Sequence, residues 1–265
     1  MTEAARAGAP PVLNDPFARL EGPLAGTTRM RLRVVRNDPL TPAMQQVVLA
    51  APELADLAYR PGQDVMLMVD VDGNRPVRRR YTIRAVDPDQ CLLTLGIVRH
   101  GDGPGERWVR VARPGDEIEG IAPRGKIFPS ASAAWHLFAG DFSALPAFFA
   151  MAGSLPGQAR ATIILEVPGP DDQQELSAAA DAQVMWLHRQ DRPAGDPPAL
   201  ADALATVPLP PGDGHAYLAG EARLVLALRE ALASGGMPEG QVSPKAYWGL
   251  GKANAPHGEP PKDAQ

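Results

Sequence analysis

The pattern of apolar and polar residues changes near residue 130, and this change constrains the fold more than any other feature of the chain. Before that point, short runs of alternating apolar and polar residues are separated by Pro, Gly, Asp and Asn, which is typical of strands joined by turns. The predicted strands span residues 29–35, 44–50, 65–71, 81–86, 92–98 and 117–121. Short strands that follow one another in this way predict a small antiparallel β-barrel.

After residue 130, apolar strands alternate with segments of helical period. The predicted strands are 135–139, 161–167, 184–188 and 216–219, and the predicted helices are 143–153, 173–180, 200–205 and 221–234. Such alternation predicts a parallel α/β sheet. We therefore expect two domains, a β-barrel at 27–129 and an α/β domain at 130–254, with tails at 1–26 and 255–265.

Composition limits the classes of function. The single cysteine, Cys91, excludes an intrachain disulfide and a four-cysteine zinc or iron–sulfur site, and the histidines have no metal-binding spacing. The net charge of −5 argues against a nucleic-acid partner. No apolar run approaches the roughly 18 residues of a membrane helix, and residues 1–11 lack the apolar core of a signal peptide. We expect a cytoplasmic monomer with no integral membrane segment and no metal site.

Residues 75–84 carry five arginines and no acidic residue. Within them, Arg79-Arg-Tyr-Thr82 suits a flavin nucleotide, because an arginine can bind a pyrophosphate, a tyrosine ring can stack on the isoalloxazine and a hydroxyl can bond to its polar edge. A solvated basic edge strand is the alternative. Because side chains alternate along a strand, Arg78 and Arg80 are expected on the face opposite Arg79, where they can meet an anionic substrate.

Three further segments suit phosphates or nucleotides. Residues 100–108 form a glycine-rich turn that opens a short helix, and its backbone N–H groups, with His100 and Arg107, can bind a phosphate, although a surface loop has the same pattern. Residues 140–146 and 219–221 each join a strand end to a helix N-terminus, where an open α/β sheet places its ligand, although ordinary capped turns look alike. The G-x-G-x-x-G dinucleotide fingerprint is absent.

With these motifs in order, the chain resembles the siderophore-interacting protein family, which are flavin-dependent ferric-siderophore reductases of the ferredoxin-NADP reductase superfamily. The resemblance rests on Arg79-Arg-Tyr-Thr-Ile-Arg84, the 100–108 loop, Gly140-Asp-Phe-Ser-Ala-Leu-Pro-Ala147, Ala219-Gly-Glu221 and Tyr247-Trp-Gly-Leu-Gly251. It implies an FAD-binding barrel, an α/β domain that receives NADH or NADPH, and a ferric siderophore as the substrate. The implied reaction passes electrons from NAD(P)H through FAD to chelated Fe(III).

The resemblance also implies roles for individual residues. The FAD-binding set is Arg79, Arg80, Tyr81, Thr82, Ile83, Arg84, His100, Gly103, Pro104, Gly105 and Trp108. The NAD(P)H-binding set is Asp141, Ser143, Ala144, Gly220, Glu221, Tyr247 and Trp248. The candidate substrate-binding cations are Arg78, Lys245 and Lys252. No protein residue is assigned to the chemical step, which takes place on the flavin.

Two departures from the family pattern leave alternatives open. Phe142-Ser143 stands where the family commonly has Glu-Thr, and Gly249-Leu250 stands where it commonly has arginines. The first change concerns the nicotinamide site, and the second reduces the positive charge around an anionic chelate. The alternatives are a flavin reductase, an electron-transfer flavoprotein that takes electrons from a ferredoxin, and a non-catalytic protein that binds flavin or a siderophore.

Overall fold

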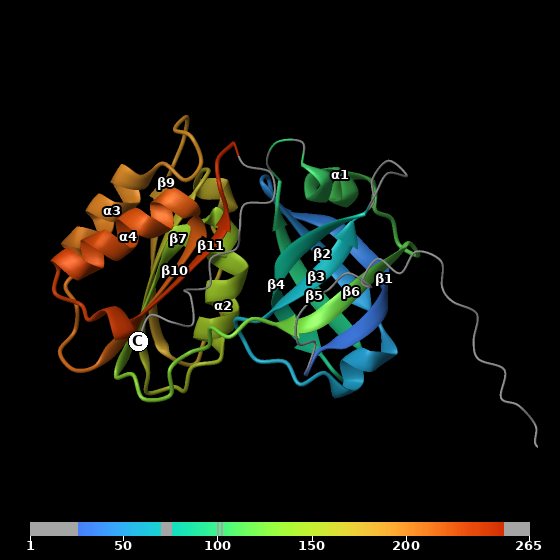
Figure 1. The fold of residues 1–265 in the computed structure, drawn as a ribbon, viewed down its shortest axis with the longest axis horizontal. Helices are drawn as coiled ribbons and strands as arrows, with labels where there is room; N and C mark the ends of the chain where they lie inside the picture. Colours follow the sequence, from blue (N-terminus) through green and yellow to red (C-terminus); the bar gives the residue numbers. More distant parts are fainter. Residues whose placement is uncertain (1–25, 70–75, 100, 102, 252–265) are drawn as a thin grey trace, which may run out of the picture.

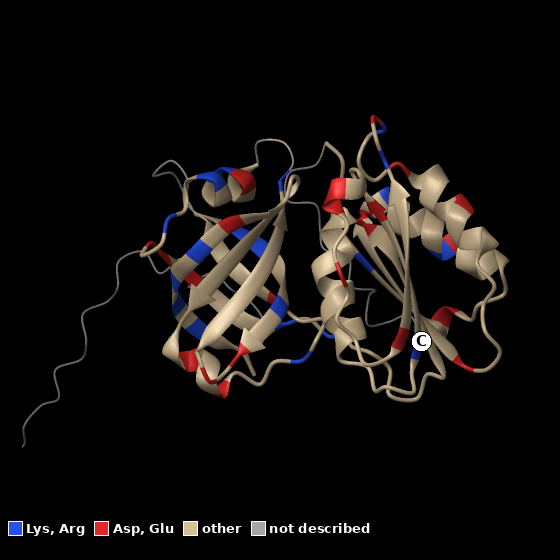
Figure 2. Cartoon of the chain, turned by 180° about the vertical axis from the view of Figure 1, so that it is seen from behind, with Lys and Arg blue, Asp and Glu red and all other residues tan. Residues whose placement is uncertain are grey.

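The structure, a computed structural model, describes residues 26–69, 76–99, 101 and 103–251. Two bodies lie side by side, a β-barrel and a layered α/β domain (Figure 1). Lys and Arg residues are frequent on the barrel strands, whereas Asp and Glu residues stand out on the α/β domain (Figure 2).

The N-terminal body is a closed antiparallel barrel with the strand order β1-β2-β5-β4-β3-β6. Its elements are β1 (Thr28–Thr41), β2 (Met44–Ala50), η1 (Pro52–Asp56), β3 (Asp64–Val69), β4 (Val77–Asp87), β5 (Leu92–Val98), α1 (Pro104–Val111) and β6 (Glu117–Arg124). Alternation decides which side chains point inward. In β1, Met30, Leu32 and Val34 are buried in the barrel core, and Arg31 and Arg33 between them are exposed.

The C-terminal body is a five-stranded parallel sheet with the order β11-β10-β7-β8-β9. Its strands are β7 (Trp135–Asp141), β8 (Arg160–Val167), β9 (Asp181–His188), β10 (Gly214–Glu221) and β11 (Val242–Trp248). Its helices are η2 (Phe142–Ala144), α2 (Leu145–Gly153), η3 (Pro170–Asp172), α3 (Pro197–Thr206), α4 (Ala222–Ser234) and η4 (Glu239–Gln241). The helix α2 lies between the sheet and the barrel, and α3 and α4 cover the other face (Figure 1).

The predicted fold class, an antiparallel barrel followed by a parallel α/β sheet, is confirmed. Two local predictions need correction. The predicted helix at 173–180 is wrong, because these residues form a loop that packs Leu176 and Ala180 against the core beside α2. The strand β11 was not predicted, and it forms at the sheet edge by parallel pairing with β10.

The loop after β8 ties the two bodies together. The Asp172 carboxylate is buried, and its Oδ1 accepts hydrogen bonds from the Thr41 hydroxyl (2.6 Å) and the Ala43 backbone N–H (2.8 Å). Arg84 of β4 donates a 2.6 Å hydrogen bond to the Gln174 side chain. These contacts fix the position of the barrel relative to the sheet, and they account for the missing helix because tertiary contacts override local propensity.

None of the helices that the structure describes is long and apolar enough to cross a membrane. Within the same residues, no group of three or more His, Cys, Asp or Glu side chains could hold a metal ion.

Candidate functional site

The first part of the site lies where β4 passes the start of α1. A Cβ atom at Gly105 would lie 2.2 Å from the Tyr81 hydroxyl oxygen and 3.7 Å from Cγ of Arg79. Only glycine permits this approach, so α1 sits directly against Arg79 and Tyr81, which share one face of β4. Burial raises the pKa of the Tyr81 phenol, which therefore stays protonated and able to donate a hydrogen bond.

The start of α1 suits an anionic group. Its N-cap residue is Gly103, which provides no side-chain hydrogen bond to the first turn, and a Cβ atom there would meet nothing within 4 Å. Backbone N–H groups at a helix start are donors to phosphates, and Pro104 favours the helical backbone at the first position. With Arg79 beside it, this open backbone fits the pyrophosphate of FAD.

The other predicted FAD residues lie in different places. Trp108 and Ile83 are buried in the barrel core, so their contribution is packing that supports α1 and β4. The Arg84 side chain faces the α/β domain, where it bonds to Gln174. His100 lies outside the described residues.

The opposite face of β4 looks toward the α/β domain. The Thr82 hydroxyl donates a 3.3 Å hydrogen bond to the Tyr247 hydroxyl of β11. Arg80, two residues before Thr82, forms hydrogen bonds of 2.9 and 2.6 Å with the Asp64 carboxylate. Thr82 and Arg80 therefore share the face opposite Tyr81, although the sequence analysis placed all three in one FAD-binding set.

The candidate substrate-binding cations differ in their exposure to solvent. Lys245 is only 5% exposed, and its Nζ lies 3.1 Å from Asp64 Oδ2, so its charge is paired inside the protein, and its predicted contact with a substrate stays a prediction. Arg80 is held by the same carboxylate. Arg78 is exposed, and Lys252 lies outside the described residues, so the binding of an anionic chelate by these two stays a prediction.

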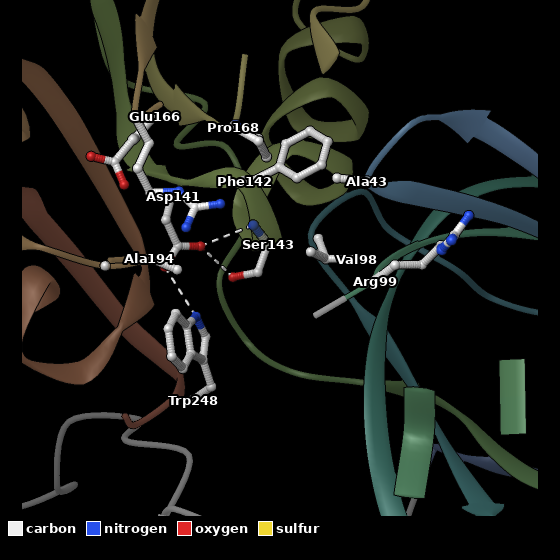
Figure 3. A pocket seen from close by; sticks show the side chains of 12 residues that line it. Ala43, Val98, Arg99, Asp141, Phe142, Ser143, Glu166, Pro168, Ala194 and Trp248 are labelled. Carbon is white, nitrogen blue, oxygen red and sulfur yellow. Dashed lines mark hydrogen bonds between the residues drawn. The ribbon is translucent and has the colours of Figure 1, made fainter. Parts of the chain in front are cut away.

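A pocket opens at the carboxyl edge of the parallel sheet, between the two bodies (Figure 3). Its walls include Val98 and Arg99 from the barrel and Asp141, Ser143, Glu166 and Trp248 from the α/β domain. The cavity measures about 50 Å³, which holds little more than water. A dinucleotide bound here would therefore lie largely across the mouth of the pocket.

Asp141, at the end of β7, organises this pocket. Its Oδ1 accepts hydrogen bonds from the Ser143 backbone N–H (2.9 Å) and hydroxyl (2.5 Å), and its Oδ2 accepts from the Glu221 N–H (2.7 Å) and the Trp248 indole N–H (3.0 Å). Burial raises the pKa of the Asp141 carboxyl, and these hydrogen bonds oppose the shift. Gly220, with a φ of 136°, brings β10 so close that a Cβ atom would lie 2.5 Å from Asp141 Oδ2.

Two further members of the predicted NAD(P)H-binding set have structural roles in the α/β domain. Glu221 caps α4 by accepting hydrogen bonds from the N–H groups of Arg223 and Leu224, and its second oxygen accepts from the N–H of Leu250. Ala144 is completely buried in the core. Asp141 and Glu221 thus hold the C-terminal segment against the sheet, and Trp248 forms part of the pocket wall.

Several residues of the pocket were not in the predicted site sets, among them Glu166 and Arg189. Glu166 lies opposite Asp141 on the neighbouring strand β8, is buried, and forms a 3.6 Å ion pair with Arg192. Burial raises its pKa, and Arg192 opposes the shift. Arg189 follows β9 and also lines the pocket. Both Glu166 and Arg189 stand at the carboxyl ends of strands that the sequence predicted, and that position was the available signal.

The comparisons with known proteins agree with this arrangement. The family model described as siderophore-interacting protein matches residues 133–251, and the model described as siderophore-interacting FAD-binding domain matches residues 67–127. Ferric vibriobactin reductase ViuB of Vibrio cholerae is 33% identical over 183 residues, which cover 68% of this chain and 67% of ViuB. The chain belongs to the siderophore-interacting protein family. The expected FAD cofactor follows from this membership, and the barrel is the FAD-binding domain.

The chain is also similar to a further relative and to two solved structures. An uncharacterized protein of Mycobacterium tuberculosis is 37% identical over 161 residues, 57% of this chain and 56% of that protein, so the match spans little more than half of this relative. A siderophore utilization protein from T. fusca superposes with a TM-score of 0.79 at 28% identity, covering 88% of this chain and 97% of that chain. The siderophore-interacting protein SipS of Aeromonas hydrophila gives 0.74 at 28% identity, covering 87% and 94%.

Proposed function

We propose that this protein is an FAD-dependent reductase of ferric siderophores, which passes electrons from NADH or NADPH through FAD to chelated Fe(III) and so releases Fe(II) for iron assimilation. The observation that carries the proposal is the hydrogen bond between Thr82 of the FAD-binding barrel and Tyr247 of the α/β domain. It joins the flavin-binding strand to the strand beside the nucleotide pocket. The name of ViuB, a ferric vibriobactin reductase, supports the choice of substrate.

Each part of the site has a physical task under this proposal. Arg79 and the open start of α1 hold the FAD pyrophosphate, and the Thr82 hydroxyl bonds to the polar edge of the flavin. Asp141 orients the Ser143 hydroxyl and the Trp248 ring at the nucleotide pocket. Bound FAD supplies the conversion between a two-electron donor and a one-electron acceptor. Siderophores bind Fe(III) through hard oxygen ligands, and reduction to Fe(II) weakens that binding, so the protein needs no acid or base at the iron.

The test follows electrons through the purified protein. FAD should bind and give a yellow protein, NADH or NADPH should bleach it under anaerobic conditions, and a ferric hydroxamate or catecholate siderophore with an Fe(II) trap should restore the colour while Fe(II) accumulates. The variant Thr82→Val keeps the size of the side chain and removes the hydroxyl, so it should retain FAD and react more slowly. A protein that takes up no FAD, or whose reduced flavin leaves every ferric siderophore intact, would contradict the proposal.

A ferredoxin as the electron donor is a second candidate, favoured by the nucleotide pocket itself. The cavity is small, Trp248 closes part of it, and Phe142 is buried in the apolar core where the family commonly has an acid. Comparing flavin reduction by NADH, NADPH and a reduced ferredoxin distinguishes the donors. The proposal places the reaction in the cytoplasm and treats the protein as a monomer, which size-exclusion chromatography with light scattering can check.

A further inference from the structure

Three charged side chains meet at the boundary between the two bodies, and we refer to Asp64, Arg80 and Lys245 as the interdomain ion cluster. Asp64 of β3 accepts two hydrogen bonds from Arg80 of β4 and one of 3.1 Å from Lys245 of β11. The side chains of Asp64 and Lys245 are 3% and 6% exposed, and that of Arg80 is 19% exposed. One carboxylate therefore lies between two cations, and Asp64 and Lys245 are almost completely removed from water.

The ion cluster lies beside the hydroxyl that is assigned to the flavin edge. Asp64 is the direct cross-strand partner of Thr82, and side chains so paired lie about 5 Å apart at Cβ. Lys245 Nζ lies 5.5 Å from the centre of the Tyr247 ring, whose hydroxyl meets Thr82. The segment that leaves the barrel also covers the cluster, since the Cβ position of Gly125 is 3.5 Å from both Asp64 Oδ2 and Lys245 Nζ.

We propose that the interdomain ion cluster sets the reduction potential of the bound FAD. A flavin gains negative charge when it is reduced, and a nearby net positive charge in a medium of low dielectric constant stabilises that form more than the oxidised one. The Lys245 charge therefore raises the potential, which favours uptake of electrons from the donor, and the Asp64 charge lowers it. This inference rests on the proposed flavin site, and it assigns Lys245 and Arg80 to the flavin instead of the ferric chelate.

The alternative is that the ion cluster only holds the two bodies together. The two roles differ in the sign of their effects. Lys245→Met removes one positive charge and Asp64→Asn removes one negative charge, so an electrostatic role shifts the flavin potential in opposite directions. A purely structural role predicts shifts in the same direction, or none, because both variants break the same contact.

The experiment measures the midpoint potential of bound FAD by anaerobic titration, with no nucleotide or siderophore present. Lys245→Met should disfavour the reduced flavin by at least tenfold, which is about 30 mV for two electrons, and Asp64→Asn should shift the potential the other way. Lys245→Arg keeps the charge and should stay near the wild-type potential. Arg160→Met removes an exposed cation at the start of β8, and it should change nothing because solvent screens that charge.

FAD occupancy and thermal melting are recorded for each variant, because Asp64→Asn removes the carboxylate that separates the buried Lys245 from the partly buried Arg80 and so lowers stability. If that variant does not fold, the comparison of Lys245→Met with Lys245→Arg decides the matter. Equal shifts in these two variants, shifts of the same sign in Lys245→Met and Asp64→Asn, or wild-type potentials throughout would overturn the inference. Because no substrate takes part, these outcomes are independent of whether the protein reduces ferric siderophores, and a protein without FAD would fail the proposed function first.

Discussion

The buried carboxylate of Asp172 should contribute more to stability than any exposed charge of the same loop. The sequence around it, Asp171-Asp172, is typical of a solvated loop, yet Asp172 is 4% exposed and accepts hydrogen bonds from Thr41 and Ala43 of the barrel. Its neighbour Asp171 is exposed. Replacement of each by alanine therefore compares the same chemical change in two environments, one residue apart.

The expected magnitude follows from the two hydrogen bonds. A bond to a charged acceptor contributes about 1.5–3 kcal/mol, and removal of the acceptor leaves a buried hydroxyl and a buried N–H without their partner. Relief from burying the Asp172 charge offsets part of this loss. We expect Asp172→Ala to lower the free energy of unfolding by about 3 kcal/mol and the melting temperature by about 6–12 °C. Asp171→Ala should stay within about 0.5 kcal/mol of the wild type.

Urea denaturation followed by tryptophan fluorescence measures both variants, and Thr41→Val completes a double-mutant cycle. Thr41→Val alone removes one of the two donors to Asp172 and should cost about 1 kcal/mol. In the Asp172→Ala background it should cost much less, because its partner is already gone. Equal stability of Asp172→Ala and Asp171→Ala, or strictly additive effects of Asp172→Ala and Thr41→Val, would refute the reasoning.

Three further predictions concern the flavin strand and the dependence of stability on pH. Gly105→Ala should weaken FAD binding at least tenfold, because the new Cβ would collide with the Tyr81 hydroxyl. Adding Tyr81→Phe should restore part of the affinity, since the nearest ring carbon would lie 3.5 Å from that Cβ. Arg79→Ala should also weaken FAD binding at least tenfold in a fluorescence titration, and wild-type affinity would contradict its phosphate role. Burial lowers the pKa values of His136 and His215. Stability should therefore fall as the pH drops below about 6.5. Replacing both histidines by Gln should make the melting temperature depend less on pH in that range.

The sequence predicted the elements whose pattern is local. Alternation along residues 29–35 and the apolar run 161–167 define strands without reference to the rest of the chain. The strand β11 was missed because it contains Pro244 and half-buried polar residues, and it depends on pairing with β10. The helix predicted at 173–180 follows from good helix formers, but hydrogen bonds between this loop and the barrel determine its conformation.

In the site, too, the features that depend on neighbouring residues could be predicted, and those that depend on contacts between distant segments could not. The motif around Arg79 and the strand ends at Asp141 and Glu221 could be recognised from residue types and order alone. The burial of Lys245 could not, because its partner Asp64 stands 181 residues earlier in the chain. A lysine beside Tyr247-Trp248 resembles a surface cation until the barrel supplies the opposing carboxylate. Motif reading therefore locates such a site but does not distinguish its exposed charges from its paired ones.

The contacts across the domain boundary also give the proposed electron transfer a direction. On the pocket side, the Asp141 carboxylate is held by four neutral donors, and a positive charge that develops in the pocket would lower its pKa and favour its ionised form. On the flavin side, the interdomain ion cluster includes the buried positive charge of Lys245. A hydride donor becomes more positive as it reacts and its acceptor more negative, so the ionised form of Asp141 and the charge of Lys245 would both stabilise transfer from the pocket to the barrel. Neither body has this arrangement alone, because Lys245 and Asp64 come from different domains.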